Sequence, residues 1–116
     1  MVLTQKTNTG IQASLDATKV SCVAVVGSGY WGKNLVHNFH QMGALKLICD
    51  KNEALLNQLK ERYHDAGTCL ALSDVLMREE IRCVVIATPA ETHFTVCHEA
   101  LLAGKHVFVE KPLSLT

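Results

Sequence analysis

Short apolar runs alternate with longer segments of helical spacing from residue 20 to the end of the chain. The runs are rich in Val, Ile and Cys and carry few charges, which is typical of strands that are buried on both faces of a sheet. They cover residues 20–26, 44–49, 68–70, 82–87 and 106–109. Because a helical segment separates one strand from the next, the pattern predicts βαβ units with right-handed crossovers. We expect an α/β fold, a doubly wound (Rossmann) parallel sheet with the strand order 3-2-1-4-5.

The segments between the strands place apolar residues three or four positions apart, so each presents an apolar stripe to the sheet. The side chains expected to face inward are Trp31, Leu35, Phe39 and Met42 in the first helix, Leu55, Leu56, Leu59 and Tyr63 in the second, and Phe94, Cys97 and Leu101 in a helix over residues 91–103. Asn52 is expected to cap the second helix, and Ser73 a short helix that reaches about residue 79. We expect Gly43 and Gly104 to end helices, and Gly67 to end the connection before the third strand.

The two ends of the chain differ from this pattern. Residues 1–19 are rich in Thr, Gln, Asn, Ser and Lys without a clear period, which predicts a flexible arm before a single domain over residues 20–116. Residues 113–116 have the composition of a capping turn that begins another helix. We therefore expect the chain to be a fragment that lacks a C-terminal α/β substrate domain.

Composition excludes several classes of protein. Hydrophobic residues make up 48% of 116 residues, enough for one compact domain, and 11 basic side chains balance 11 acidic ones. With no net positive charge, the protein has no long-range electrostatic attraction for nucleic acid or an anionic membrane. The apolar runs are too short to cross a bilayer. No secretory signal precedes the first strand, so we expect a cytoplasmic protein. The five cysteines are scattered without a CxxC pair, which indicates reduced core thiols and no metal site: Cys22, Cys49, Cys69, Cys83 and Cys97.

A glycine-rich loop follows the first strand and opens the first helix, with the sequence Gly27-Ser28-Gly29-Tyr30-Trp31-Gly32. In a GxGxxG loop so placed, Gly27 permits a tight turn, Gly29 leaves room for phosphates and Gly32 lets helix and strand pack closely. Backbone N–H groups at the helix start then donate to a dinucleotide pyrophosphate. The alternative is a glycine turn that serves backbone conformation alone.

Asp50 lies 18 positions after Gly32, at the end of the second predicted strand. A carboxylate there accepts hydrogen bonds from the hydroxyls of the adenosine ribose and repels a 2′-phosphate, so the cofactor predicted is NAD, with NADP less favoured. The neighbouring Lys51 weakens this preference, because a lysine could partly accommodate the phosphate. Alternatively, Asp50 only opens the turn before Asn52.

Two further segments lie at the carboxyl ends of strands, where doubly wound sheets bind ligands: residues 87–93 (ATPAETH) and residues 110–112 (Glu-Lys-Pro). Together with residues 29–34 (GYWGKN), they resemble the glucose-fructose oxidoreductase, inositol dehydrogenase and rhizopine-catabolism family, written Gfo/Idh/MocA. The resemblance covers about residues 20–116. Each motif alone is weak, but the three at these spacings form a specific combination.

The resemblance implies roles for the residues that match these motifs. Thr88 and Pro89 would line the nicotinamide end of the cofactor, and Glu110 would lie at the nicotinamide ribose. Lys111 would be the catalytic residue at the reacting hydroxyl, with Pro112 forming a cis peptide that aims it. An ammonium group would stabilise the negative charge that develops on oxygen as hydride leaves the alcohol.

Each of these residues also has a structural interpretation. Lys111 and Glu110 would be solvated charges in a strand-to-helix turn, and His93 would lie in the first turn of its helix instead of contacting the cofactor. Tyr30 would shield the cofactor, whereas Trp31 is more typical of core packing.

The resemblance implies hydride transfer between a nicotinamide and the hydroxyl of a sugar or nucleotide-sugar, in a protein that is expected to form a homo-oligomer. No general base is found in the sequence. One alternative is a stand-alone NAD-binding or redox-sensing module without catalysis. Another is a methyltransferase that binds S-adenosylmethionine, whose glycine loop usually closes one position before Gly32.

Overall fold

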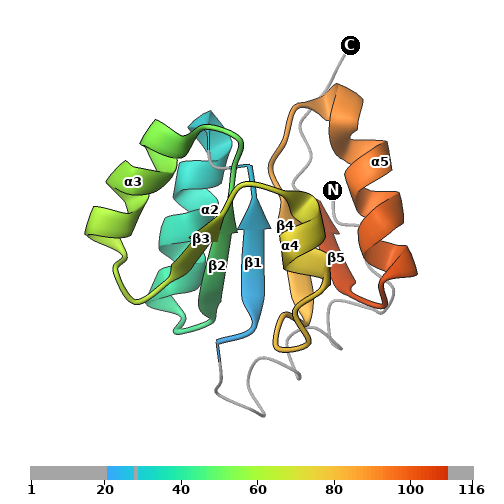
Figure 1. The fold of residues 1–116 in the computed structure, drawn as a ribbon, viewed down its shortest axis with the longest axis horizontal. Coiled ribbons are helices and arrows are strands. Elements are labelled where there is room, and N and C mark those ends of the chain that lie inside the picture. The colour runs from blue at the N-terminus through green and yellow to red at the C-terminus, as the bar shows by residue number, and fades with distance from the viewer. Residues whose placement is uncertain (1–20, 28, 110–116) are drawn as a thin grey trace.

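A parallel sheet with helices on both faces forms the computed structural model, which describes residues 21–27 and 29–109, without the side chains of Tyr30, Trp31 and Ala90 (Figure 1). The sheet order in this part of the chain is β3-β2-β1-β4-β5, and every pairing is parallel. The strands are β1 (Val23–Val26), β2 (Leu45–Cys49), β3 (Gly67–Cys69), β4 (Cys83–Ile86) and β5 (His106–Val109). The predicted fold class and strand order are confirmed. The predicted arm over residues 1–19 and the capping turn over residues 113–116 lie outside the described residues.

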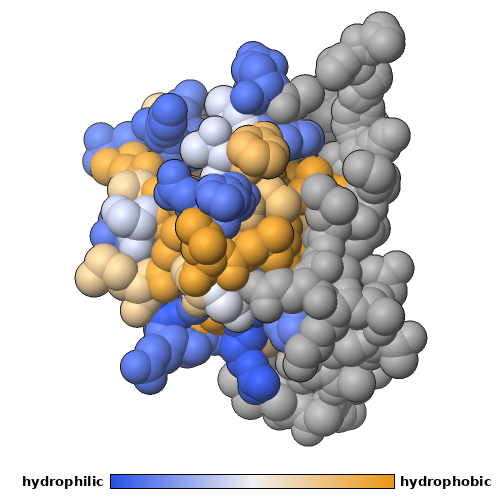
Figure 2. Space-filling view, turned by 90° about the vertical axis from the view of Figure 1, so that its right-hand side faces the viewer, coloured by the Kyte–Doolittle hydropathy of each residue, from blue (hydrophilic) through white to orange (hydrophobic). Residues whose placement is uncertain are grey.

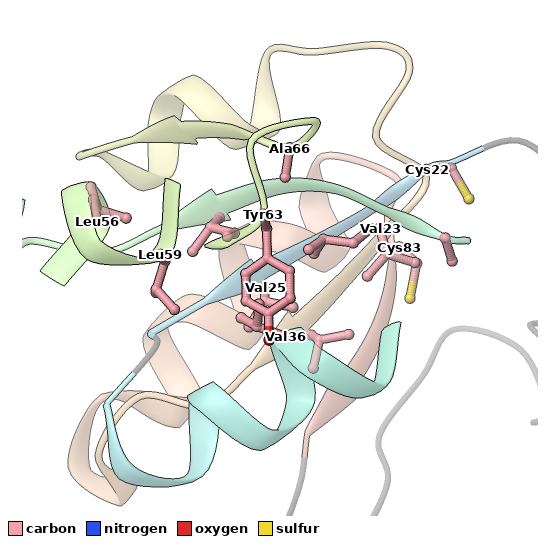
Figure 3. Close-up of a cluster of buried hydrophobic side chains, with 13 residues drawn as sticks. Cys22, Val23, Val25, Val36, Leu56, Leu59, Tyr63, Ala66 and Cys83 are labelled. Carbon is pink, nitrogen blue, oxygen red and sulfur yellow. The ribbon is translucent and has the colours of Figure 1, made fainter. Parts of the chain in front are cut away.

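Four helices connect the strands: α2 (Tyr30–Gln41), α3 (Glu53–Arg62), α4 (Leu72–Leu76) and α5 (Ala90–Leu102). Helices α2 and α3 cover one face of the sheet, where Val36, Leu56 and Leu59 pack on alternate strand residues such as Val23 and Val25. On this face Figure 3 shows Tyr63 lying across the sheet toward Val36 and Val25. Helices α4 and α5 cover the other face through Val75, Cys97 and Ala100. The wholly apolar strands β1 and β4 follow from this coverage, because a strand between two helical layers has no solvent-facing side.

Several local predictions are confirmed at the helix ends. The Asn52 side chain accepts a hydrogen bond from the backbone N–H of Leu55 at 3.1 Å and so caps α3. Gly43 and Gly104 follow α2 and α5 with φ of 75° and 82°, a left-handed conformation that terminates a helix at little cost only in glycine. Four of the five cysteines are buried in the core as expected, and Cys69 is partly exposed.

Other local predictions are wrong. Helix α4 has Ala71, not Ser73, as its N-cap and ends at Leu76, because starting at Leu72 places Leu72, Val75 and Leu76 together against the core. Strand β3 begins at Gly67 and ends before Leu70, which is exposed. In α2 the predicted Leu35 and Phe39 do pack against the core, beside the fully buried Val36, which was not predicted, but Met42 is 55% exposed in the C-cap.

The inward face of α5 is also different from the predicted one. Phe94 is 79% exposed and stacks on His98, and Leu101 is exposed, while Cys97 and Ala100 face the sheet. The predicted stripe of Phe94, Cys97 and Leu101 is therefore rotated around the helix axis relative to the stripe that is buried. Ala100 is only weakly apolar, yet it is the α5 side chain that is completely buried against the sheet. Figure 2 views the side of the molecule that carries α5 and β5, and apolar surface gathers there between polar groups.

A buried lysine, Lys105, lies at the amino end of β5. Lys105 is 7% exposed, and its Nζ donates to the carbonyl oxygens of Arg78 at 2.8 Å and Ile81 at 2.7 Å, in the turn between α4 and β4. Burial lowers the pKa of Lys105, and the nearby carboxylates of Glu80 and Glu79 oppose that effect. These two hydrogen bonds therefore connect the amino end of β5 to the turn before β4.

Lys105→Met should lower the free energy of unfolding by about 2 kcal/mol, because two buried carbonyl groups lose a charged donor. Lys60→Met is a matched control, since Lys60 also donates to carbonyl groups, those of Ala66 and His64, but is exposed. Water can replace the exposed lysine, so its loss should cost below about 1 kcal/mol. Urea unfolding of both variants measures the difference, and equal losses would contradict this account.

No helix among the described residues is long and apolar enough to cross a membrane, and no group of three or more potential metal ligands occurs among them.

Candidate cofactor-binding site

The carboxyl ends of β1, β2 and β4 meet at one edge of the sheet and carry the predicted site residues (Figure 1). Hydrogen bonds extend the ladder past the strand ends: Gly27 N–H donates to Cys49 O at 2.7 Å, and Ala87 N–H donates to Val26 O at 2.8 Å. The backbone N–H of Asp50 donates to Cys69 O at 3.1 Å. The glycine loop, Asp50 and the turn after β4 are thus fixed relative to one another by the sheet itself.

Each glycine of the loop has a different reason for lacking a side chain. Gly27 has φ of 88°, and a Cβ on it would lie 2.9 Å from the backbone nitrogen of Thr88. At Gly32 a Cβ would collide with the carbonyl oxygen of Gly27, so α2 packs directly against the loop. At Gly29 no atom of the described part of the chain lies within 4 Å of an added Cβ. Gly27 and Gly32 are therefore required by backbone packing, whereas the absence of a side chain at Gly29 leaves open space.

The start of α2 suits an anion. Its N-cap, Gly29, provides no side-chain hydrogen bond, and no acidic residue lies in the first turn. By contrast, the start of α3 is capped by Asn52 and carries Glu53. Backbone N–H groups at an uncapped helix start donate to phosphate oxygens and are aided by the helix dipole. With open space beside Gly29, this helix end fits the pyrophosphate of a dinucleotide.

Asp50 is half-buried after β2, and one of its carboxylate oxygens has a structural role. Asp50 Oδ1 accepts a hydrogen bond from the backbone N–H of Asn52 at 2.8 Å, so the residue does shape the turn before α3. A carboxylate has about four lone-pair sites on its two oxygens, so the turn and a ribose contact are compatible. Lys51 is exposed next to it. The ribose contact stays a prediction.

The turn after β4 contains an unusual hydroxyl. Thr88 Oγ1 is buried, and no hydrogen-bond partner for it is present in the part of the chain that the structure describes. His93, in the first turn of α5, lies with its Nε2 2.5 Å from Thr88 O, so the ring donates to this carbonyl group. Pro89 is exposed and forms the N-cap of α5. His93 thus holds the backbone of Thr88, an interaction that no sequence motif indicates.

Thr88→Val should leave the unfolding free energy unchanged or raise it by up to about 1 kcal/mol, because it replaces an unpaired buried hydroxyl with a methyl group of similar size. If Thr88 Oγ1 binds the cofactor, the same variant should weaken NAD binding about fivefold, which corresponds to about 1 kcal/mol for a neutral hydrogen bond. Calorimetric titration and thermal unfolding separate the two effects. A loss of stability would show that the hydroxyl has a structural partner.

The structure brings Gly27, Gly29, Gly32, Asp50 and Thr88 to the same edge of the sheet. Four other predicted site residues lie outside the described residues: Ser28, Glu110, Lys111 and Pro112. The helical backbone includes Tyr30 and Trp31, but their side chains are not described. The predicted shielding by Tyr30, packing of Trp31, catalytic role of Lys111 and cis peptide at Pro112 stay predictions.

A doubly wound sheet with a GxGxxG loop at an uncapped helix start defines the class of dinucleotide-binding Rossmann domains. Residues 22–116 match the model of the family described as "Oxidoreductase family, NAD-binding Rossmann fold" (GFO_IDH_MocA). The chain belongs to this family, as the motifs predict.

Relatives with curated names are much longer than this chain. A "Glycosyl hydrolase family 109 protein" of Shewanella amazonensis is 31% identical over 105 residues, which are 81% of this chain and 23% of the relative. The protein of that name in Shewanella baltica strain OS195 is 37% identical over 115 residues, 88% of this chain and 25% of the relative. The chain thus spans about a quarter of the length of these relatives.

Solved structures of dehydrogenases and related enzymes share the fold. The structure of GenD2 from gentamicin A biosynthesis, in complex with NAD, has a TM-score of 0.75 and 33% identity, with 84% of this chain and 28% of that chain covered. Scyllo-inositol dehydrogenase from Lactobacillus casei, with bound NAD(H) and scyllo-inositol, has a TM-score of 0.73 and 29% identity, with 84% and 29% covered.

Proposed function

We propose that this chain is the NAD-binding part of an oxidoreductase that transfers a hydride between a nicotinamide and a hydroxyl of a sugar or nucleotide-sugar. The observation that carries the proposal is the open space at Gly29 beside an uncapped helix start, with Asp50 on the adjacent strand end. The relatives support it, because scyllo-inositol dehydrogenase was solved with NAD(H) and a cyclitol, and GenD2 with NAD.

In this proposal the residues of the chain bind and orient the two reactants. The start of α2 holds the pyrophosphate, Asp50 holds the adenosine ribose, and Thr88 Oγ1 donates to or accepts from the nicotinamide half. NAD supplies the carbon that accepts the hydride. Lys111 would place an ammonium group at the reacting hydroxyl and stabilise the charge that develops on oxygen. Glu110 would lie at the nicotinamide ribose, and Pro112 would aim the lysine.

The Shewanella relatives favour a second candidate function for the whole protein. Their name is that of a glycosyl hydrolase, although the part that matches this chain is an NAD-binding domain. Some glycosidases depend on NAD and do not use the usual pair of carboxylates. In such an enzyme a hydride removed early in turnover is returned later, so the net reaction is hydrolysis.

Absorbance at the NADH wavelength separates these two functions in the full-length protein. A dehydrogenase accumulates NADH in proportion to the sugar oxidised. A hydrolase that recycles its cofactor releases the leaving group from an aryl glycoside without net NADH. We propose that the full-length protein forms a homo-oligomer in the cytoplasm and takes a small-molecule substrate.

Calorimetric titration of the 116-residue chain tests the cofactor proposal. We expect binding of NAD and NADH at micromolar or weaker affinity, with weaker binding of NADP and no oxidation of sugars. A stand-alone sensing module predicts the same binding, but the coding frame would then stop after Thr116. Properly folded protein that gives no heat with NAD or NADH would disprove the cofactor role. Tight binding of S-adenosylmethionine would instead favour a methyltransferase.

A further inference from the structure

Two cysteine side chains lie together at the edge of the proposed cofactor site. Cys49 is the last residue of β2, Cys69 is the last residue of β3, and the two are register partners in the parallel pairing. Cys49 belongs to the buried cluster on this face of the sheet, and Cys69 packs against the same cluster. Register partners on adjacent strands point to the same face of the sheet, so the two sulfur atoms face the same space.

The two thiols differ in accessibility. Cys49 is 3% exposed, and burial raises its pKa to about 12, with the neighbouring Cys69 adding to the effect. Burial also raises the pKa of Cys69, and its interaction with Cys49 opposes part of that increase. Cys69 is partly exposed, and its Sγ lies 3.8 Å from Ala71 O. Cys69 is therefore the sulfur that ionises first and that a small oxidant reaches.

Both cysteines are connected directly to Asp50. Asp50 follows Cys49 in the chain, and its backbone N–H donates to the carbonyl oxygen of Cys69 at 3.1 Å. A change in the separation of β2 and β3 at this point therefore moves the carboxylate that is proposed to hold the ribose.

We propose that Cys49 and Cys69 form a redox-sensitive dithiol, which a hydroperoxide converts to a disulfide that weakens dinucleotide binding at Asp50. The effect on binding rests on the proposed NAD site, whereas the disulfide itself does not. In the reduced protein both sulfurs are free thiols.

The chemistry balances with one hydroperoxide per disulfide. The Cys69 thiolate attacks one oxygen of the peroxide, the O–O bond breaks, and the other oxygen leaves as water or an alcohol after it takes up a proton. Cys49 then attacks the resulting sulfenic sulfur, the S–S bond forms and a second water leaves with the thiol proton. The two thiols lose two electrons and the peroxide gains them.

Strand geometry permits the bond with a small displacement. Neighbouring strands lie about 4.7–4.9 Å apart, within the Cα separation of about 4.4–6.8 Å that disulfides span. To form the bond, the two sulfur atoms must approach to about 2.05 Å. Strand β3 has three residues and lies at the edge of the sheet, so we expect it to shift when the disulfide forms. The carbonyl group of Cys69, which accepts a hydrogen bond from Asp50 N–H, would move with it.

The other cysteines provide internal controls. Cys22 and Cys83 also interact electrostatically, but they are 2% and 3% exposed and lie at the amino end of β1 and β4 (Figure 3). Cys97 is buried on helix α5, whereas the other four cysteines lie in strands or directly before one. Exposure therefore predicts that hydroperoxide reacts first at Cys69.

Hydrogen peroxide treatment of the 116-residue chain, followed by tryptic mass mapping without reductant, tests the disulfide. We expect a cross-link between the peptides of residues 47–51 and 63–78, which cleavage after Lys46, Lys51, Arg62 and Arg78 would release. Cys69→Ala should abolish the cross-link, and Cys83→Ala should retain it. Oxidation that stops at single sulfenic or sulfinic acids, or a cross-link between other cysteines, would overturn the proposal.

Titration of reduced and oxidised protein with NAD tests the consequence. We expect about a tenfold higher Kd after oxidation, restored by dithiothreitol, and no change on oxidation of Cys69→Ala. Equal affinity of the reduced and cross-linked forms would overturn the regulatory effect. If reduced protein does not bind NAD, the proposed function fails, while the mass map still decides whether the dithiol forms.

Discussion

Gly32→Ala is expected to lower the free energy of unfolding by about 3 kcal/mol or more and to abolish NAD binding. The new Cβ would collide with the carbonyl oxygen of Gly27 and lie 2.8 Å from its carbonyl carbon. Both atoms belong to backbone that the sheet holds through Cys49, so the collision is relieved only if α2 moves away from the loop. Overpacking against rigid neighbours typically costs about 1–3 kcal/mol, and backbone contacts place this site at the upper end.

Gly29→Ala is the matched control, because it adds the same methyl group in the same loop at a position with open space. No described atom lies within 4 Å of a Cβ at this position, and the φ of Gly29 is −72°. Its unfolding free energy should stay within about 0.5 kcal/mol of the original. NAD affinity should nevertheless fall, since the methyl group occupies the space proposed for the phosphates. Urea unfolding with calorimetry distinguishes the pair, and similar stability of both variants would contradict the packing account.

The sheet order followed from the sequence because each strand is a continuous apolar run between helical segments. A strand covered on both faces has no polar positions, so its signal is strong even over the four residues of β1 or β4. The glycine loop was equally accessible to prediction, since close backbone packing requires glycine at Gly27 and Gly32.

The orientation of α5 was not accessible in the same way. Two overlapping stripes exist on this helix, and the larger apolar side chains belong to the exposed one, with Phe94 outside and Ala100 inside. A prediction from periodicity ranks residues by their hydrophobicity. Close packing of the helix on the sheet instead favours a small side chain such as that of Ala100 at the contact. Ser73 was misjudged for a related reason, because the burial of Leu72 fixes where α4 begins.

Contacts that match no sequence motif account for the rest of the site. Cys49 and Cys69 are neighbours only through the register of β2 and β3, and His93 reaches Thr88 O from the first turn of α5, which begins at Ala90. Neither spacing corresponds to a motif. The sequence indicated residues that the family resemblance places at a cofactor, and the structure added the contacts that hold Asp50 and Thr88 in place.

Asp50→Asn is expected to reduce the preference for NAD over NADP by about 10- to 100-fold, as charge-assisted hydrogen bonds are worth about 1.5–3 kcal/mol. An asparagine still accepts the hydrogen bond from Asn52 N–H, so the turn before α3 is retained. The negative charge that repels a 2′-phosphate is lost. Calorimetric titration with NAD and NADP measures the ratio of the two affinities.

Two further variants separate charge from turn geometry. Asn52→Ala removes the cap of α3 and should lower stability by about 1 kcal/mol without changing the ratio of affinities. Lys51→Ala in the Asp50→Asn background should reverse part of the gain in NADP binding, because Lys51 is then the nearest predicted partner for the 2′-phosphate. An unchanged ratio in Asp50→Asn would show that Asp50 serves only the turn, and the preference for NAD would then have to arise elsewhere in the site.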